Sequence, residues 1–280
     1  MTQVVRYVFI MLISMASYNA LSCFPESDVK IPVQKNTSKF LSNQLTKAQM
    51  NGIIHRFKSV WEPIIREKYD KKLIVKDEWD NKDVDAYATR DMQDNPIIVL
   101  KGGLVRHPQM SENGLLLILC HELGHHYGGA PKSFRGRSTK RSWSSAEGQA
   151  DYFATNKCMS KIFEMGLLFD AYDFSKTSKC KTDLCLATFN AAMSVSRVFA
   201  SLKLDWSEPN PNSESSYRVS RTFYGHPKPQ CRFDTYIAGS LCVEKFDSDF
   251  DDENYAIGSC THENRPEAAR PTCWFSPQDY

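Results

Sequence analysis

Residues 111–127 read SENGLLLILCHELGHHY, and this stretch decides how the rest of the chain is interpreted. Ser111 is suited to cap a helix, and the glycine pair that follows Tyr127 is suited to end it. The run from Leu115 to Cys120 is apolar on every side, as in a helix that is surrounded by protein. We therefore expect a buried helix that ends at Tyr127.

Five residues of this helix, His121-Glu122-Leu123-Gly124-His125, form an HExxH motif. Two histidines four residues apart lie on one helical face about one turn apart, so both imidazoles can reach one metal ion. Glu122 then projects near the open coordination position. The motif predicts a zinc site with one Zn2+ per chain. His126 is adjacent and points away from the metal face, so we expect it at the surface or supporting a ligand.

A third ligand is available on the next expected helix, which runs from about Ser145 to Met165. Glu147 and Asp151 share one face of that helix, and Glu147 lies 22 residues beyond His125. One carboxylate can bind the metal while the other orients a ligand histidine. We assign Glu147 to the metal and Asp151 to the supporting position.

Three protein ligands leave a fourth position for water, which distinguishes a catalytic from a structural zinc site. Zinc lowers the pKa of that water toward about 7, and Glu122 can take its proton, which gives a hydroxide that attacks a peptide carbonyl. The alternative is that His121, His125 and Glu147 are polar residues paired in a core. Burying these groups among apolar side chains costs several kcal/mol unless a cation compensates, which favours the metal.

In these residues and in further segments, the chain resembles the gluzincin metallopeptidases, specifically the CAAX prenyl protease and HtpX-type zinc endopeptidase family. That family shows a strand and a glycine turn before an HExxH helix, then ExxxD on a later helix, then His-Pro with an arginine six residues after the histidine. The matching segments are Ile97 to Leu104, His121 to His125, Glu147 with Asp151, and His226-Pro227 with Arg232. The resemblance covers roughly residues 84 to 240.

The resemblance implies roles for residues that the motif alone does not explain. His226 would donate to the oxyanion of the tetrahedral intermediate, and Arg232 would support that oxyanion or the zinc-ligand carboxylate. The strand before the motif helix would be an open sheet edge, to which a protein or peptide substrate adds as an extended strand. Ile97 to Leu100 is the candidate edge; the alternative is an interior strand needed only for packing.

Many members of this family cross the membrane several times, whereas this chain carries no apolar span after its first 22 residues. The chain therefore resembles a soluble, exported branch, which argues against prenylated substrates. The additional cysteines have no counterpart in the family that we can assign, and we expect them to brace the site covalently.

Hydrophobic spacing predicts the elements around the motif. Thr46 and Gln49 form a capping-box pattern at the start of a long amphipathic helix, which we expect to bend near Pro63. Three short strands are expected at 73–76, 84–89 and 97–100. A further helix is expected at 184–202, and a loop rich in Pro, Ser and Asn follows at 204–216.

Together these elements predict an α+β fold of zincin-like type, mainly helical, with a small sheet packed on the HExxH helix and a disulfide-braced C-terminal region. We expect a signal peptide at 1–22, a metallopeptidase domain at 23–240 with its motif core at 84–240, and a cysteine-rich extension at 241–280. The acidic run from Asp247 to Glu253 lacks EF-hand spacing, which favours a solvated loop over a calcium site.

The composition excludes disorder along the whole chain. Of the 280 residues 41% are hydrophobic and 24% are charged, which is the ordinary mix of a folded globular protein. The 35 basic and 33 acidic residues leave a formal net charge of +2. This charge is too near balance for an obligate nucleic-acid binder, so we expect no nucleic acid as a partner.

The first 22 residues carry one charge, Arg6, followed by an apolar run from Tyr7 to Ala16 and by small residues around Ala20. This arrangement is typical of a secretory signal peptide. The alternative is a membrane anchor, but the uncharged run is shorter than the roughly 20 residues that a spanning helix needs. We therefore expect an extracytoplasmic protein, either periplasmic or secreted.

Nine cysteines are many for a reducing cytosol but typical of a chain that folds after export. Because nine is odd, at least one thiol is free, lipidated or bonded to another molecule. Cys23 would follow the cleavage site in a loose lipoprotein signal, which makes it a candidate for a lipid anchor. Cys120 lies beside the motif, where a small buried thiol is the simpler interpretation. If Cys120 is free, we expect Cys23 to be bridged.

Three hypotheses of function follow. The first is an exported zinc endopeptidase that cleaves peptides or proteins with Glu122 as general base. The second keeps the zinc but cleaves peptide cross-links of a cell wall, where basic residues from Lys132 to Arg141 contact an anionic polymer; a solvated loop is the alternative interpretation of that segment. The third is a non-enzymatic, zinc-stabilised binding module, against which Glu122 argues because a structural site does not need it.

Overall fold

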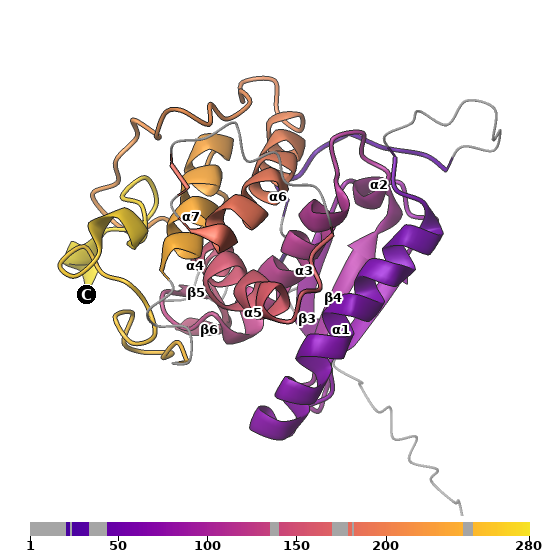
Figure 1. Ribbon diagram of the computed structural model, residues 1–280, viewed down its shortest axis with the longest axis horizontal. Coiled ribbons are helices and arrows are strands. Elements are labelled where there is room, and N and C mark those ends of the chain that lie inside the picture. Colours follow the sequence, from indigo (N-terminus) through magenta and orange to yellow (C-terminus); the bar gives the residue numbers. More distant parts are fainter. Residues whose placement is uncertain are drawn as a thin grey trace, which may run out of the picture.

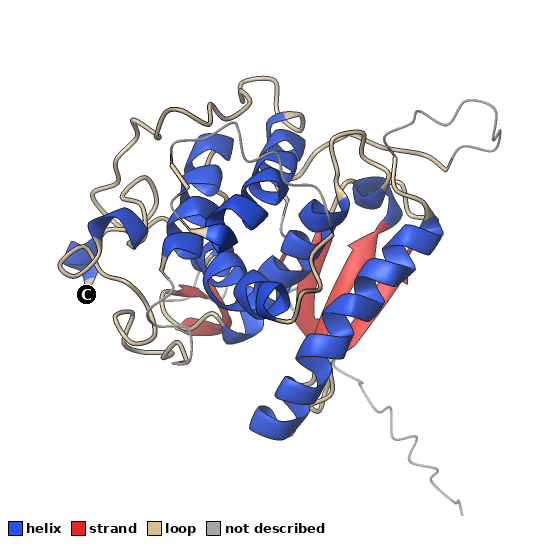
Figure 2. Cartoon of the chain, in the orientation of Figure 1, coloured by secondary structure: helices blue, strands red, loops and turns tan. Residues whose placement is uncertain are grey.

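The computed structural model describes residues 21–22, 24–33, 44–134, 140–169, 179–180, 182–242 and 249–280. Within these ranges the chain forms a mixed α+β fold with two small sheets. The larger sheet and helix α1 (Lys47–Tyr69) lie on one side of the molecule, and helices α4 to α7 lie on the other (Figure 1). The HExxH helix, α3 (Glu112–Tyr127), lies between them and contacts both (Figure 2). The α+β class and the sheet beside the HExxH helix are confirmed.

Helix α1 begins where the capping box predicts. The Thr46 hydroxyl accepts from the backbone N–H of Gln49, and the Gln49 side chain accepts from the backbone N–H of Thr46. Pro63 lies inside the helix. The buried apolar face of α1 packs against α3 and consists of Met50, Ile53, Phe57, Val60, Trp61 and Ile65.

The four-stranded sheet has the order β1-β3-β4-β2. Its strands are β1 (Leu21–Ser22), β2 (Ile74–Glu78), β3 (Ala86–Arg90) and β4 (Pro96–Lys101). Strand β4 pairs in parallel with β2 and antiparallel with β3, so it is an interior strand. The expectation that Ile97–Leu100 forms an open edge is therefore wrong. Its uninterrupted apolar sequence is that of a strand covered on both faces, and all four residues are buried.

Helix α3 also begins at its predicted cap, since Ser111 Oγ accepts from the N–H of Gly114 at 3.0 Å. A short helix, α2 (Gly102–Val105), precedes it. The two helices that carry predicted metal ligands, which we call the ligand-bearing helices, are α3 and the helix that begins at Glu147. Gly124 of the motif lies against the second of these, where an added Cβ would fall 2.8 Å from the carbonyl oxygen of Ala150. A glycine at this position therefore allows the two helices to approach closely.

The second ligand-bearing helix is continuous over three stretches: α4 (Glu147–Phe153), the π-helical segment η2 (Ala154–Met159) and α5 (Ser160–Glu164). This agrees with the predicted helix at about 145–165. An antiparallel hairpin of β5 (Lys132–Phe134) and β6 (Arg141–Ser145) precedes it, where we expected a basic loop. Helix α6 (Asp183–Ala200) is capped by Thr182 and matches the predicted helix at 184–202.

Helix α7 (Pro229–Leu241) packs against α6 and α4 and has no counterpart among the predicted helices. Residues 249–280, with the short helices η4 (Pro266–Ala268) and η5 (Pro277–Asp279), pack on α7 and α4. A Cβ on Gly148 would lie 2.2 Å from the ring of Trp274, which is fully buried. The C-terminal segment therefore lies directly on the helix that begins with Glu147.

Four disulfides are present: Cys120–Cys158, Cys180–Cys185, Cys231–Cys273 and Cys242–Cys260. The expectation of a free thiol at Cys120 is wrong, because close packing of the two ligand-bearing helices brings Cys158 within bonding distance. Eight of the nine cysteines are thus bonded to one another, which leaves Cys23, outside the described residues, as the odd one. The disulfide-braced C-terminal region is confirmed.

Within the described ranges no helix is both long and apolar enough to cross a membrane. The predicted signal peptide lies outside those ranges except for Leu21 and Ser22, which pair with β3 at Ala88 and Tyr87.

Candidate metal centre

The two histidines of the motif present their rings to one another inside the protein. His121 and His125 are 0% and 1% exposed, and their ring centres lie 4.7 Å apart in an edge-to-face arrangement. Both side chains leave α3 on the face that packs against α4. The predicted helical spacing therefore produces a pair of buried imidazoles.

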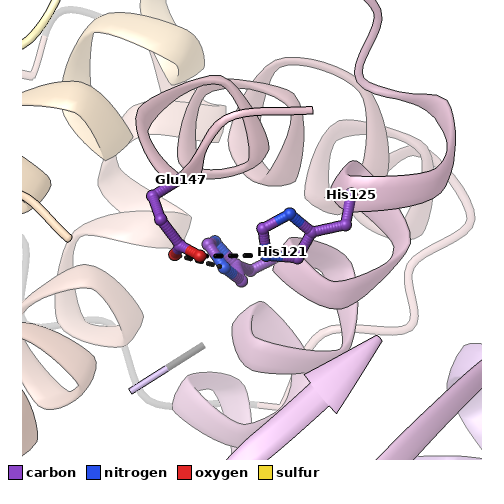
Figure 3. A group of neighbouring side chains, drawn as sticks. All are labelled: His121, His125 and Glu147. Carbon is purple, nitrogen blue, oxygen red and sulfur yellow. Dashed lines mark ion pairs between the residues drawn. The ribbon is translucent and has the colours of Figure 1, made fainter. Parts of the chain in front are cut away.

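Glu147, the first residue of α4, reaches both rings (Figure 3). Its Oε2 lies 3.4 Å from His121 Nε2, and its Oε1 lies 3.5 Å from His125 Nε2. One ligand atom of each residue lies within 4.8 Å of the other two. Together the three side chains form a buried group that could hold a metal ion.

The donor atoms suit a tetrahedral ion. Zinc–ligand bonds of about 2.0–2.1 Å place neighbouring ligand atoms roughly 3.3 Å apart. The two measured separations are close to this value, although each ends at a different oxygen of Glu147. Nε2 of His125 and Oε2 of Glu147 are buried and have no hydrogen-bond partner among the described residues. Leaving such groups unsatisfied costs about 1–3 kcal/mol each, and a cation between them removes that cost.

Hydrogen bonds at Nδ1, the ring nitrogen that faces away from Glu147, orient the two histidines. Nδ1 of His121 lies 2.7 Å from Oδ1 of Asp151, and Nδ1 of His125 lies 2.9 Å from the backbone carbonyl oxygen of Ser145. When each Nδ1–H donates to these oxygens, each Nε2 carries the lone pair that faces Glu147. This is the arrangement that metal-binding histidines commonly show.

Arg232 of α7 lies behind the carboxylates. Its Nη2 donates to Oδ1 of Asp151 at 2.6 Å, and its Nη1 lies 3.7 Å from Oε2 of Glu147. The guanidinium is fully buried and stacks over the ring of Phe199 at 3.8 Å. The positive charge of Arg232 is thus balanced by two acidic groups, and it keeps both near the histidines.

The surroundings of His125, Glu147 and Asp151 favour the deprotonated forms that metal binding requires. Burial lowers the pKa of His125 to about 4, so this imidazole is neutral at pH 7. Burial alone would raise the pKa of Glu147, but the three neighbouring imidazoles outweigh burial and hold that pKa well below its usual range. Likewise, Arg232 and His121 more than offset burial and lower the pKa of Asp151.

The two remaining predicted catalytic residues are Glu122 and His226. Glu122 is fully buried on α3 and lies between His121 and His125 in the sequence. His226 precedes α7, and its Nε2 lies 3.6 Å from Oε1 of Glu147 while 27% of its side chain is exposed. The structure therefore brings His226 from a distant part of the sequence to the open side of the group.

Of the two positions expected for His126, at the surface or supporting a ligand, the surface position is wrong. His126 is buried, its Nε2 lies 3.4 Å from the carbonyl oxygen of Ile97, and its ring stacks on Trp143 at 4.8 Å. The His126 side chain points away from Glu147, as expected, because adjacent residues on a helix are about 100° apart. That direction leads into the sheet rather than to solvent.

Sequence reasoning missed Ser144 and Ser145 of β6. The Ser145 carbonyl oxygen accepts from His125, and Ser144 Oγ lies 3.1 Å from the same Nδ1. A backbone carbonyl leaves no signature in the residue type, so only the position of this segment directly before Glu147 could have suggested a role.

Comparison with known proteins adds no relative. A scan against protein-family models, a search of curated proteins and a search of solved structures each found no match. The resemblance to gluzincin peptidases therefore rests on the motif residues.

Proposed function

We propose that the protein is a zinc endopeptidase in which His121, His125 and Glu147 hold the ion. The observation that carries the proposal is a buried group of two histidines and one glutamate that could hold a metal ion, with a further buried carboxylic acid, Glu122, on the helix of the two histidines. A purely structural zinc site has four protein ligands and no need of that carboxylate.

In this proposal the ion supplies a Lewis acid that acidifies water and polarises the substrate carbonyl. Glu122 accepts a proton from the attacking water and passes it to the leaving amine as the peptide C–N bond breaks. His226 donates to the oxyanion that forms on the carbonyl, a role that suits its place on the open side of the group. Asp151 and Arg232 hold His121 and Glu147 in position.

We also propose export of the protein to an oxidising compartment. Four disulfides link the described residues, and such bonds persist outside the reducing cytosol. The N-terminal sequence pattern of a signal peptide supports the same conclusion.

The decisive variant is Glu122→Gln. It should bind one zinc per chain, as the parent does, and lose about 100-fold or more of the rate of casein cleavage, because a positioned general base contributes that much. The parent treated with a chelator should lose activity and regain it with added zinc. Casein cleavage by the variant at the parent's rate would rule out this mechanism.

The cell-wall hypothesis has lost part of its support. Lys132 is buried, and its Nζ pairs with Asp252 at 2.7 Å and donates to the Trp143 carbonyl oxygen at 3.1 Å. Two other basic residues of that segment, Arg135 and Arg137, lie outside the described residues. Release of peptides from purified cell walls by the parent, without any cleavage of casein, would favour this alternative over ours.

A further inference from the structure

A group of aromatic rings surrounds one exposed arginine at the start of β6. The group consists of Phe134 on β5, Arg141 on β6, Tyr224 and Tyr280, and we call it the aromatic–arginine cluster. Arg141 lies over two of the rings, with its guanidinium carbon 4.2 Å from the ring centre of Phe134 and 5.1 Å from that of Tyr224. Phe134 and Tyr280 are 38% and 40% exposed.

Two segments connect this cluster to the candidate site. Strand β6 begins at Arg141 and ends at Ser145, whose carbonyl oxygen accepts from His125. Tyr224 lies two residues before His226. Because an extended residue advances about 3.3 Å, the cluster lies within reach of a peptide of a few residues bound at the metal centre.

Arg141 is held in place but keeps donors for a ligand. Its Nη1 donates to the Lys132 carbonyl oxygen at 2.9 Å, and it forms no ion pair with any described residue. Asp279, which precedes Tyr280 of the cluster, does not pair with Arg141 but accepts a hydrogen bond from the backbone N–H of Thr222. The stacked rings restrict the guanidinium plane, so less entropy is lost when Arg141 binds a carboxylate.

The wall of rings is itself fixed. The hydroxyl groups of Tyr224 and Tyr280 lie 3.1 Å apart, and the ring of Tyr280 stacks on buried Phe275 with the ring centres 5.7 Å apart. Phe134 packs edge-to-face on Tyr224 at 4.8 Å. A rigid apolar wall that holds an exposed guanidinium suits an acidic side chain with an apolar stem or neighbour.

We propose that Arg141, with the rings of Phe134 and Tyr224, forms a substrate subsite that selects peptides with an aspartate or glutamate close to the bond that is cleaved. This inference rests on the proposed endopeptidase function. It adds a preference among peptides that the metal centre alone does not provide.

The test uses peptide pairs that differ only by Glu or Gln at one position, scanned on both sides of the cleaved bond. At one or two positions the parent should prefer Glu about fivefold in kcat/KM, mainly through KM, which is the upper range for an exposed ion pair. The preference should shrink as salt is added. Arg141→Ala should abolish it, Arg141→Lys should keep part of it, and Arg141→Glu should turn it toward Lys-containing peptides.

Arg66→Ala is the matched control, since Arg66 is an exposed arginine in the last turn of α1 and should leave the Glu preference intact. Zinc content of one per chain shows that each variant is folded. An unchanged Glu preference in Arg141→Ala, or no preference in the parent, overturns the subsite.

Failure of the proposed function gives a different result, because the zinc-loaded parent then cleaves neither peptide of any pair. In that case peptide binding to zinc-loaded Glu122→Gln protein tests the subsite. A Kd for the Glu peptide about fivefold below that of the Gln peptide supports it, and equal Kd values overturn it.

Discussion

Disulfides brace two regions of the molecule, and the two regions differ in what those bonds join. In the helix-pair region, formed by α3 and α4–η2–α5, Cys120–Cys158 joins the residue before His121 to the helix that begins with Glu147. In the C-terminal region, residues 249–280, two disulfides attach loops to α7. Only Cys120–Cys158 joins the two helices that carry the proposed metal ligands. Loss of this disulfide should therefore affect metal binding more than loss of either disulfide of the C-terminal region.

A fully buried arginine also contacts each region: Arg232 of α7 contacts the helix-pair region, and Arg270 belongs to the C-terminal region. Arg232 faces the carboxylates of Asp151 and Glu147, whereas Arg270 donates to the neutral Gln149 side chain at 2.5 Å. Burial lowers the pKa of Arg270 to about 10. At the candidate site the positive charge of Arg232 is therefore balanced by carboxylates. In the C-terminal region the positive charge of Arg270 is instead solvated by neutral polar groups of the protein.

The largest expected difference is in zinc affinity, between variants that each lose one histidine, one from each region. His121→Ala should lower zinc affinity by more than the roughly 10–100-fold that loss of an outer partner causes, because a ligand itself is removed. His262→Ala, in the C-terminal region, should leave zinc affinity unchanged, since His262 Nε2 lies 2.9 Å from the Arg270 carbonyl oxygen and pairs with no group of the candidate site among the described residues. Competition with a chromophoric chelator measures both. Equal zinc affinity in the two variants would contradict the assignment.

The two buried arginines give the next comparison. Arg232→Met leaves Asp151 and Glu147 without their cation, so it should destabilise the fold by about 3–5 kcal/mol. Arg270→Met removes hydrogen bonds to neutral groups and should cost about 2 kcal/mol. Urea unfolding of the zinc-free proteins measures both. Finding that Arg270→Met is the more damaging change would show that charge balance at the site is unimportant.

The disulfides themselves should separate stability from metal binding. Removing Cys120–Cys158 or Cys242–Cys260 by paired Cys→Ala changes should each cost about 2–4 kcal/mol. Only the first should also weaken zinc binding, about tenfold, because it alone joins the two ligand-bearing helices. Thermal unfolding and zinc titration of the two variants check this. A matched loss of zinc affinity in both would remove the distinction between the regions.

Acid should destabilise the zinc-free protein through buried histidines of the helical part. Burial lowers the pKa of His107 and of His125 from 6.5 to about 4. Between these values the unfolded chain binds protons that the folded chain does not, so stability falls as the pH drops from about 6.5 to 4, by at most about 3 kcal/mol for each histidine. His107→Gln should flatten the profile measured by urea unfolding at several pH values. An unchanged slope in that variant would show that His107 is not the cause.

Local patterns were enough to predict the central elements. The capping box at Thr46, the cap at Ser111 and the apolar run of α3 each depend on neighbours within a few residues, and their helices begin where predicted. The spacing of His121, His125 and Glu147 likewise predicted a group that could hold a metal ion.

Long-range packing decided the rest. Strand β4 was expected at an edge, but it lies between β2 and β3, which agrees with its apolar sequence. The order of strands in a sheet depends on contacts between distant segments, so the sequence of a single strand does not reveal it. Cys120 is bonded because Gly124 allows the two helices to approach, a contact between residues far apart in the chain. The Ser145 carbonyl oxygen belongs to the backbone, so its contact with His125 could not be predicted from residue type.

The most direct test of the account is a crystal structure of the zinc-loaded protein with anomalous data collected on both sides of the zinc absorption edge. We expect one strong peak about 2.0–2.2 Å from Nε2 of His121, Nε2 of His125 and an oxygen of Glu147. A protein that carries zinc with its peak elsewhere, or that has no peak between these three side chains at saturating zinc, would contradict the account.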